Sequence, residues 1–172
     1  PLYREIKSKG VSDNPLQLIR NDWSLVRFIR HMLLGINMLK MPANEIDSRV
    51  NNMNLDRIVW KIMKDPFKPD MTEDEVLFAV KQYKRFLNLK IKYPELNLVP
   101  TDDIDMVWHS HILDTEQYAK DCANLFGKFL HHNPFFGEFG NETQEEMGIM
   151  FKETSDMWLH EYGEALETPV YF

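Results

Sequence analysis

Residues 72–94, TEDEVLFAVKQYKRFLNLKIKYP, decide the fold class of this chain. Thr72 and Glu75 have the spacing of a capping box, in which threonine accepts a hydrogen bond from the third helical amide and glutamate reaches back to the cap. Behind them the apolar residues recur at helical spacing: Val76, Val80, Tyr83, Leu87 and Ile91. Pro94 closes the pattern, since the residue before a proline is held out of the helical region. The segment therefore predicts a long amphipathic helix.

Two further helices are predicted before this one. Asn14-Pro15 offers an N-cap followed by proline at the first helical position, and apolar residues recur at helical spacing from Ile19 to Ile36. A shorter apolar face over residues 55–63 stops at Asp65-Pro66. Both patterns indicate helices that bury one side and expose the other.

Two helices joined by a short turn are predicted after Pro94. The sequence Thr101-Asp102-Asp103 places acidic residues at the start of a helix that runs to about Leu113, where they cap it and favour its positive end. Asp114 begins the next helix, and Gly127 is suited to end it because glycine adopts the left-handed conformation at low cost.

The last helix is predicted from Thr143, which forms a second capping box with Glu146, to about Ala165. We expect its buried side to hold Met147, Met150, Phe151, Trp158 and Tyr162. We expect its exposed side to hold Glu153, Asp156, Glu161 and Glu164. A strand pattern occurs only at residues 170–172. The fold class is predicted to be all-α, an irregular single-domain bundle of five to seven helices over residues 1–172.

The composition is that of a globular protein in a reducing compartment. A chain of 172 residues suits one domain, and 44% hydrophobic residues is far from the composition of disordered chains. The single cysteine, Cys122, excludes an intramolecular disulfide, and ten methionines would be open to oxidation. The first ten residues contain no apolar signal core. We therefore expect a cytoplasmic protein.

The charge pattern disfavours nucleic acid as a partner. Residues 1–68 carry 12 Lys and Arg against 7 Asp and Glu, whereas residues 69–172 carry 8 against 20. This asymmetry is typical of two faces of one domain that attract each other, and the clustered cations of a nucleic-acid surface are missing. The most apolar stretch, residues 29–41, contains four polar residues and is too short to cross a bilayer, so no membrane insertion is expected.

Chemically versatile side chains gather in residues 102–137, DDIDMVWHSHILDTEQYAKDCANLFGKFLHHNPFFG, with four of the six histidines and the only cysteine. The stretches KQYKRFLNLK, LVPTDDIDMVWHSHILDTEQY, KDC, LFG, FLHH and NPFFG resemble the signature of the glycine-rich-domain-protein-like family of plants, fungi and bacteria. The resemblance covers about residues 55–140, with its signature in 98–140, and lacks the glycine-rich extension that names the family.

The resemblance implies a functional site without naming a reaction. It marks nine residues: Asp105, Trp108, His109, His111, Tyr118, Asp121, Cys122, His131 and His132. The associations of the plant members that depend on their glycine-rich segment do not carry over to this chain.

Helical geometry narrows the choice of metal ligands. Asp105 and His109 lie one turn apart on one face, whereas His109 and His111 lie about 200° apart and do not point at one ion on an intact helix. His109 is therefore the first choice of ligand and His111 the second. His131 and His132 would lie about 12 Å further along, unless Gly127 ends the helix and turns the chain back.

Three interpretations of this segment remain open. One is a mononuclear zinc or non-haem iron site in a metal-dependent enzyme, with Asp105, His109, His111, His131 and His132 as candidate ligands. In that interpretation the candidate catalytic residues are Asp105, His109, Tyr118 and Asp121. The second is a buried His/Asp hydrogen-bond network that holds a helix hairpin together. The third is a pocket for a small molecule or a protein.

Three smaller questions stay open with it. Cys122 could act as a nucleophile beside a histidine, although a lone cysteine on an apolar helix face is usually buried. The loop NPFFGEFG after His132 could be a lid over a pocket or an ordered plug. As a non-catalytic interaction module, the chain would use the basic face of its first helix together with Phe135, Phe136 and Phe139.

Overall fold

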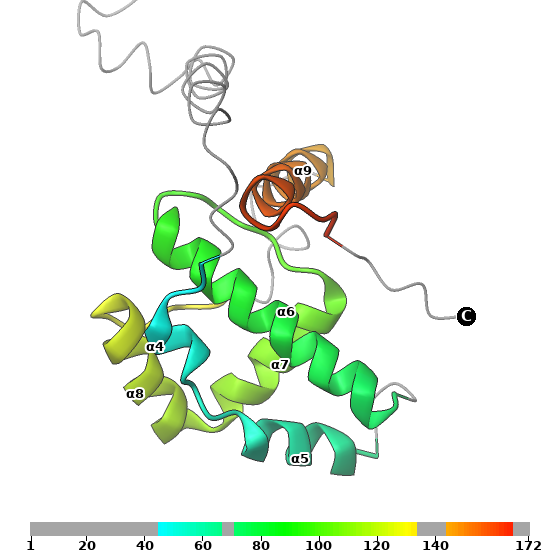
Figure 1. Cartoon of the computed structure of the whole chain (residues 1–172), viewed down its shortest axis with the longest axis vertical. Coiled ribbons are helices and arrows are strands. Elements are labelled where there is room, and N and C mark those ends of the chain that lie inside the picture. Colours follow the sequence, from blue (N-terminus) through cyan, green and yellow to red (C-terminus); the bar gives the residue numbers. More distant parts are fainter. Residues whose placement is uncertain (1–44, 67–70, 134–143, 167–172) are drawn as a thin grey trace, which may run out of the picture. The chain divides into compact units, whose positions relative to one another are not determined.

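The computed structural model describes residues 45–66, 71–133 and 144–166, which all fall within one compact unit, Ala43–Phe172. These residues form helices and no strand, which confirms the all-α class (Figure 1). The helices are α4 (Ser48–Asn51), α5 (Asp56–Lys64), α6 (Glu73–Lys92), α7 (Asp102–Leu113), α8 (Thr115–Phe126) and α9 (Gln144–Tyr162).

Several predictions fall on other parts of the chain. The amphipathic helix that begins at Asn14-Pro15, the capping role of Thr143, the aromatic loop and the strand pattern at 170–172 lie outside the described residues. The extent of the single domain over residues 1–172 therefore stays a prediction. Among the described helices none is long and apolar enough to span a bilayer.

Helix α6 is the central element, and it begins as its sequence predicts. The Thr72 backbone N–H donates to the Glu75 carboxylate at 2.7 Å, and the Glu75 N–H donates back to the Thr72 hydroxyl. Helices α4, α5 and α7 all pack against α6 (Figure 1). Four of its five predicted core positions, Val76, Val80, Tyr83 and Leu87, are buried, and burying each such large side chain contributes about 1.5–3 kcal/mol. Ile91 is partly buried, and Leu77 and Phe78 are exposed. The apolar face that the sequence predicts for α6 therefore lies in the core of the domain.

The packing of α7 on α6 depends on Phe86 and Trp108. Phe86 is fully buried, and its ring centroid lies 5.6 Å from that of Trp108. Thr101 caps α7, its hydroxyl accepting from the Ile104 N–H, so the cap is the threonine and not an acidic residue. Trp108 is thus held in the core, and the neighbouring face of α7 carries the partly buried Asp105 and the exposed His109.

Helices α7 and α8 form the predicted hairpin with one residue, Asp114, between them. The helix α8 ends at Gly127, which has a φ of 68° and donates its N–H to the Ala123 carbonyl. The chain then leaves the helix axis without regular structure over residues 129–133. The prediction that Gly127 ends this helix is confirmed.

The buried side of helix α9 matches its prediction only in part. Trp158 and Tyr162 are buried as expected, whereas Met147, Met150 and Phe151 are only partly covered. The prediction that Glu161 faces water was wrong, because Glu161 is 7% exposed and accepts hydrogen bonds from Tyr93 and Lys92. Two donors, one of them charged, offset the desolvation of its carboxylate.

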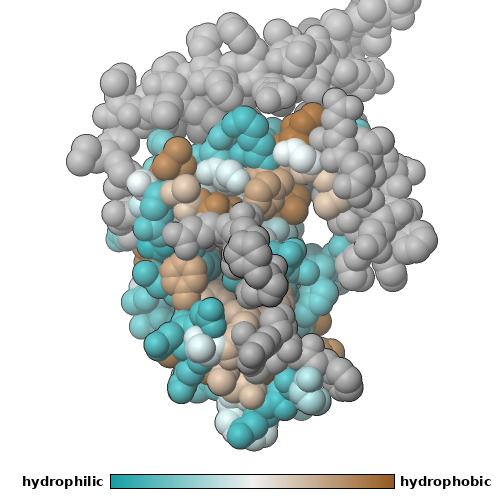
Figure 2. All heavy atoms as spheres, turned by 90° about the vertical axis from the view of Figure 1, so that its right-hand side faces the viewer, coloured by the Kyte–Doolittle hydropathy of each residue, from teal (hydrophilic) through white to brown (hydrophobic). Residues whose placement is uncertain are grey.

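Helix α9 is tied to the loop before α7 by a buried threonine. The fully buried Thr154 accepts a hydrogen bond from the Val99 N–H at 2.9 Å. On the surface that Figure 2 shows, polar and apolar side chains of the described residues are intermixed. The contact with Thr154 thus holds the loop at residues 97–100, which connects α6 to α7, against α9.

Candidate functional site

The two histidines of the Trp-His-x-His motif face different surroundings, as their angular separation on a helix requires. His111 is fully buried, whereas the side chain of His109 is 49% exposed. Each of them meets a different carboxylate. The candidate site residues therefore divide into two groups instead of converging in one cavity.

The first group consists of Asp105, His109 and His132, and we call it the triad. His132 Nε2 lies 2.7 Å from Asp105 Oδ1, and His109 Nε2 lies 3.4 Å from Asp105 Oδ2. The two imidazole rings meet edge to face with centroids 4.5 Å apart. One ligand atom from each residue can be chosen so that all three lie within 4.8 Å of one another. The triad is thus a compact set of metal-ligating groups.

A chain of hydrogen bonds brings His132 to α7. The Trp108 indole N–H donates to the Tyr118 hydroxyl at 2.8 Å, and that hydroxyl donates to the Leu130 carbonyl at 2.6 Å. The rings of Trp108 and His132 also meet edge to face, with centroids 4.5 Å apart. Tyr118 therefore holds the segment that carries His132, with its hydroxyl both accepting and donating a hydrogen bond.

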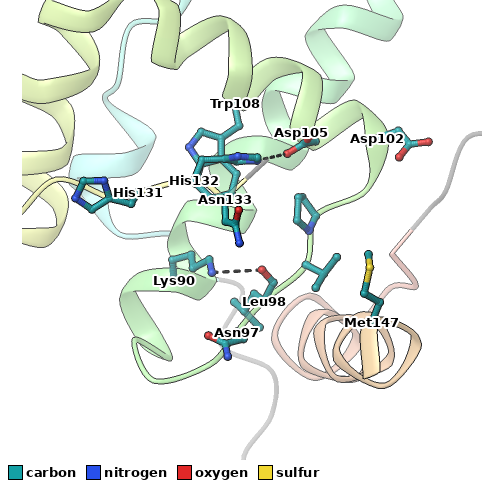
Figure 3. Close-up of a pocket in the computed structure, with 12 residues that line it drawn as sticks. Lys90, Asn97, Leu98, Asp102, Asp105, Trp108, His131, His132, Asn133 and Met147 are labelled. Atoms are coloured by element: carbon teal, nitrogen blue, oxygen red, sulfur yellow. Dashed lines mark hydrogen bonds and ion pairs between the residues drawn. The ribbon is translucent and has the colours of Figure 1, made fainter. Parts of the chain in front are cut away.

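A pocket of about 460 Å³ opens beside the triad (Figure 3). Asp105 and His132 line it, while Lys90 reaches into it from the last turn of α6 (Figure 3). The remaining walls come from the loop before α7, the segment after α8 and Met147 of α9. This volume is in the range of small-molecule sites.

Lys90 is the pocket residue whose ionisation is most strongly perturbed. Burial lowers its pKa to about 8, because an ammonium group loses hydration inside the protein. Its Nζ donates to the Leu98 carbonyl at 3.3 Å and lies 5.5 Å from the centroid of the Phe86 ring. The sequence analysis did not single out Lys90, since a lysine between Leu89 and Ile91 resembles an ordinary helix surface position.

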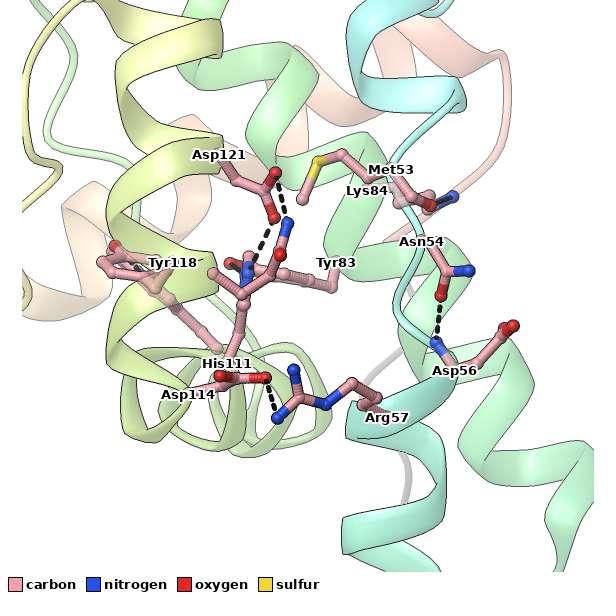
Figure 4. Close-up of polar contacts among 12 residues, drawn as sticks. Met53, Asn54, Asp56, Arg57, Tyr83, Lys84, His111, Asp114, Tyr118 and Asp121 are labelled. Atoms are coloured by element: carbon pink, nitrogen blue, oxygen red, sulfur yellow. Dashed lines mark hydrogen bonds and ion pairs between the residues drawn. The ribbon is translucent and has the colours of Figure 1, made fainter.

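The second group is a buried network around His111 (Figure 4). His111 Nδ1 lies 3.0 Å from the Tyr83 hydroxyl, and its Nε2 lies 3.1 Å from Asp121 Oδ2. Gln117 donates to the other oxygen of Asp121. These contacts join α6, α7 and α8 through polar groups that each have a partner, which is how a buried polar network specifies a fold.

The protonation of His111 follows from its partners. Burial raises the pKa of Tyr83 well above its ordinary value, so its hydroxyl keeps its proton and can donate to Nδ1. The Nε2–H of a neutral imidazole then donates to Asp121. Burial also lowers the pKa of His111, and Asp121 offsets only part of that effect. The imidazole of His111 is therefore neutral in this arrangement.

The other predicted site residues lie apart from the triad. His131 is exposed and its ring packs near Phe129, with centroids 5.0 Å apart, although His131 also lines the pocket. Cys122 is 2% exposed, in agreement with the expectation of a buried thiol. Asp121 belongs to the His111 network. Of the candidate ligands, the structure brings Asp105, His109 and His132 together and separates His111 and His131 from them.

Two comparisons with known proteins bear on this site. A family model described as UCP032817-like matches residues 45–154, which include the triad and the His111 network. Glycine-rich domain-containing proteins 1 and 2 of Arabidopsis thaliana are 35% and 33% identical to this chain over 89 residues. Each match covers 49% of this chain and 11% of the relative. The resemblance to the glycine-rich-domain-protein-like family is confirmed, and no solved structure matches the chain significantly.

Proposed function

The chain belongs to the UCP032817-like family, and from the geometry of its triad we propose that it binds one divalent metal ion, zinc or iron, through Asp105, His109 and His132. The ion would hold and polarise a small ligand in the adjoining pocket. The observation that carries this proposal is the grouping of one carboxylate and two imidazoles at the edge of a cavity.

The separations of the ligand atoms support a common ion. Zinc–nitrogen and zinc–oxygen bonds of about 2.0–2.1 Å place neighbouring ligand atoms about 3.0–3.4 Å apart. His109 Nε2 lies 3.4 Å from Asp105 Oδ2, within this range, while His132 Nε2 lies 2.7 Å from the other oxygen, Oδ1, and would move outward by a few tenths of an ångström to share an ion. All three ligand atoms lie within 4.8 Å of one another, and a movement of the half-exposed His109 ring by about 1–2 Å would bring a pair at that limit into this range. Small adjustments of the two imidazole rings therefore suffice.

The ligand types narrow the metal and its use. Two imidazoles and one carboxylate suit zinc or non-haem iron, and three protein ligands leave positions open for water or a ligand. Such an ion acts as a Lewis acid or lowers the pKa of bound water. The protein's part is to orient His132 through Trp108 and Tyr118 and to enclose the ligand beside Asp105.

Zinc titration of the tag-free chain tests the proposal. We expect one equivalent to bind wild-type protein, and His132→Ala to weaken binding at least 100-fold. His131→Ala is the matched control, because His131 is the neighbouring exposed imidazole outside the triad, and it should change the affinity less than threefold. Far-UV circular dichroism should show that both variants keep their helices.

The competing interpretation is that Asp105 only accepts hydrogen bonds from two imidazoles. The short contact between His132 and Asp105 would exist in that case too. Equal zinc affinities of wild type, His131→Ala and His132→Ala would favour it and refute a metal site at the triad.

A further inference from the structure

The ammonium group of Lys90, which lines the pocket, has no carboxylate partner among the described residues. Elsewhere on α6, Lys92 pairs with Glu161 and Arg85 pairs with Glu164. Lys90 instead meets a backbone carbonyl and the face of Phe86. Its ammonium therefore lies at the pocket wall with hydrogen-bonding capacity that the Leu98 carbonyl fills only in part.

A partly buried ammonium lowers the stability of the fold unless a negative charge lies beside it. The lowered pKa of Lys90 has burial as its only cause, which means that no nearby carboxylate favours the charged form. An anion bound against Nζ would supply that missing charge. The two acids in the pocket wall, Asp102 and Asp105, are not ion-paired with Lys90, and Asp105 faces His132 instead.

The charge of the pocket changes once the triad holds an ion. A divalent cation would more than offset the Asp105 carboxylate, so Lys90 and the ion would present positive charge from two sides of the same space (Figure 3). The amide of Asn97 also lines the pocket, as a neutral hydrogen-bonding group. Even with the Asp102 carboxylate in the wall, the ion and Lys90 would leave the pocket positive, which disfavours a cationic ligand. A purely apolar ligand would leave the partly buried Lys90 without an anion.

We propose that the pocket takes a small carboxylate-bearing molecule, whose carboxylate pairs with the Lys90 ammonium while a hydroxyl or carbonyl oxygen of the same molecule coordinates the triad's ion. This inference rests on the proposed metal site and adds the class of ligand. A volume of about 460 Å³ admits a ligand of metabolite size. Lys90 is accordingly the residue that selects acids over neutral analogues.

The test uses the zinc-loaded full chain and a panel of hydroxycarboxylates with two to six carbons, with the matching hydroxyamides as uncharged probes. Binding is measured by calorimetry at pH 7. We expect at least one acid to bind ten times or more tighter than its amide, and Lys90→Met to abolish that preference. Lys90→Arg should retain part of the preference, because it keeps the charge.

Two controls separate the possible failures. Lys81→Met removes an exposed lysine from the same helix outside the pocket and should leave the acid preference unchanged. Zinc titration of Lys90→Met should match wild type, since Lys90 is not a member of the triad. If zinc binds the triad but no acid binds below 10 mM, or acid and amide bind equally, the ligand inference is refuted and the metal site stands. Failure of zinc to bind refutes the metal site itself.

Discussion

Replacing Tyr118 by phenylalanine removes a single oxygen atom that joins α7 to the segment carrying His132. That hydroxyl accepts from the Trp108 indole N–H and donates to the Leu130 carbonyl. Trp108 is 4% exposed, so its N–H would be left buried without an acceptor, which costs about 1–3 kcal/mol. The Leu130 carbonyl is only partly buried, and its lost bond adds about 0.5–1.5 kcal/mol. Together they predict a fall of about 1.5–4.5 kcal/mol in the free energy of unfolding.

The same substitution should also weaken the metal site. His132 lies two residues after Leu130 and reaches Asp105 only if that segment stays in place. Loss of a hydrogen bond that orients a metal ligand typically costs 10- to 100-fold in affinity, or about 1.4–2.8 kcal/mol. We expect Tyr118→Phe to raise the zinc dissociation constant by that factor, measured by competition with a chromophoric chelator.

Tyr162→Phe provides a matched control. Its hydroxyl also makes two hydrogen bonds, accepting from Asn88 and donating to the Arg85 carbonyl, and Tyr162 is similarly buried. It contacts no residue of the triad in the described structure. Urea unfolding should show comparable destabilisation for both variants, with zinc affinity lowered only in Tyr118→Phe. A zinc affinity within threefold of wild type in Tyr118→Phe, or an equal loss in both, would refute the positioning role.

Three further predictions concern stability. Lys90→Met should raise the free energy of unfolding at pH 7 by about 1–3 kcal/mol, because it removes a buried ammonium. That gain should shrink between pH 8 and 10.5, because there Lys90 has lost its proton in the folded wild type but still holds it in the unfolded chain. Urea titrations in which Lys90→Met lowers the free energy of unfolding at pH 7 would contradict this. The free energy of unfolding of wild type should fall as the pH drops below about 6.5, because His111 takes up a proton more readily in the unfolded chain than in the folded protein. His111→Gln should make this fall smaller. Parallel profiles of unfolding free energy against pH for wild type and variant would contradict this prediction. Gly127→Ala should cost about 1–2 kcal/mol from its φ of 68° alone, since an added Cβ meets nothing within 4 Å, and an unchanged melting temperature would argue against that strain.

Local signals made most helix boundaries predictable. Caps and prolines mark where α5, α6 and α7 begin or end, and Gly127 marks the end of α8. These signals act within one turn of helix, so they can be read from neighbouring residues. The angular separation of His109 and His111 is equally local, and it correctly placed them on different sides of α7.

The partner of His111 and the third member of the triad depend on contacts between different segments of the chain. Which carboxylate His111 meets is decided by how α8 is rotated against α7, and helical periodicity does not define that rotation. The contact of His109 with Asp105, by contrast, spans one helical turn and was predictable. The choice of His132 over His131 depends on the bond from Tyr118 to Leu130, in a segment without regular structure. Glu161 was misassigned for the same reason, because its donors come from the end of α6.

The central claim is that Asp105, His109 and His132 bind one metal ion together. Its most direct test is anomalous diffraction at the zinc absorption edge from crystals of the zinc-loaded chain. We predict one strong peak within about 2.0–2.2 Å of an Asp105 oxygen and of a ring nitrogen from each histidine. A peak elsewhere, or a triad that contains no zinc and keeps its direct His132–Asp105 contact, would contradict the claim.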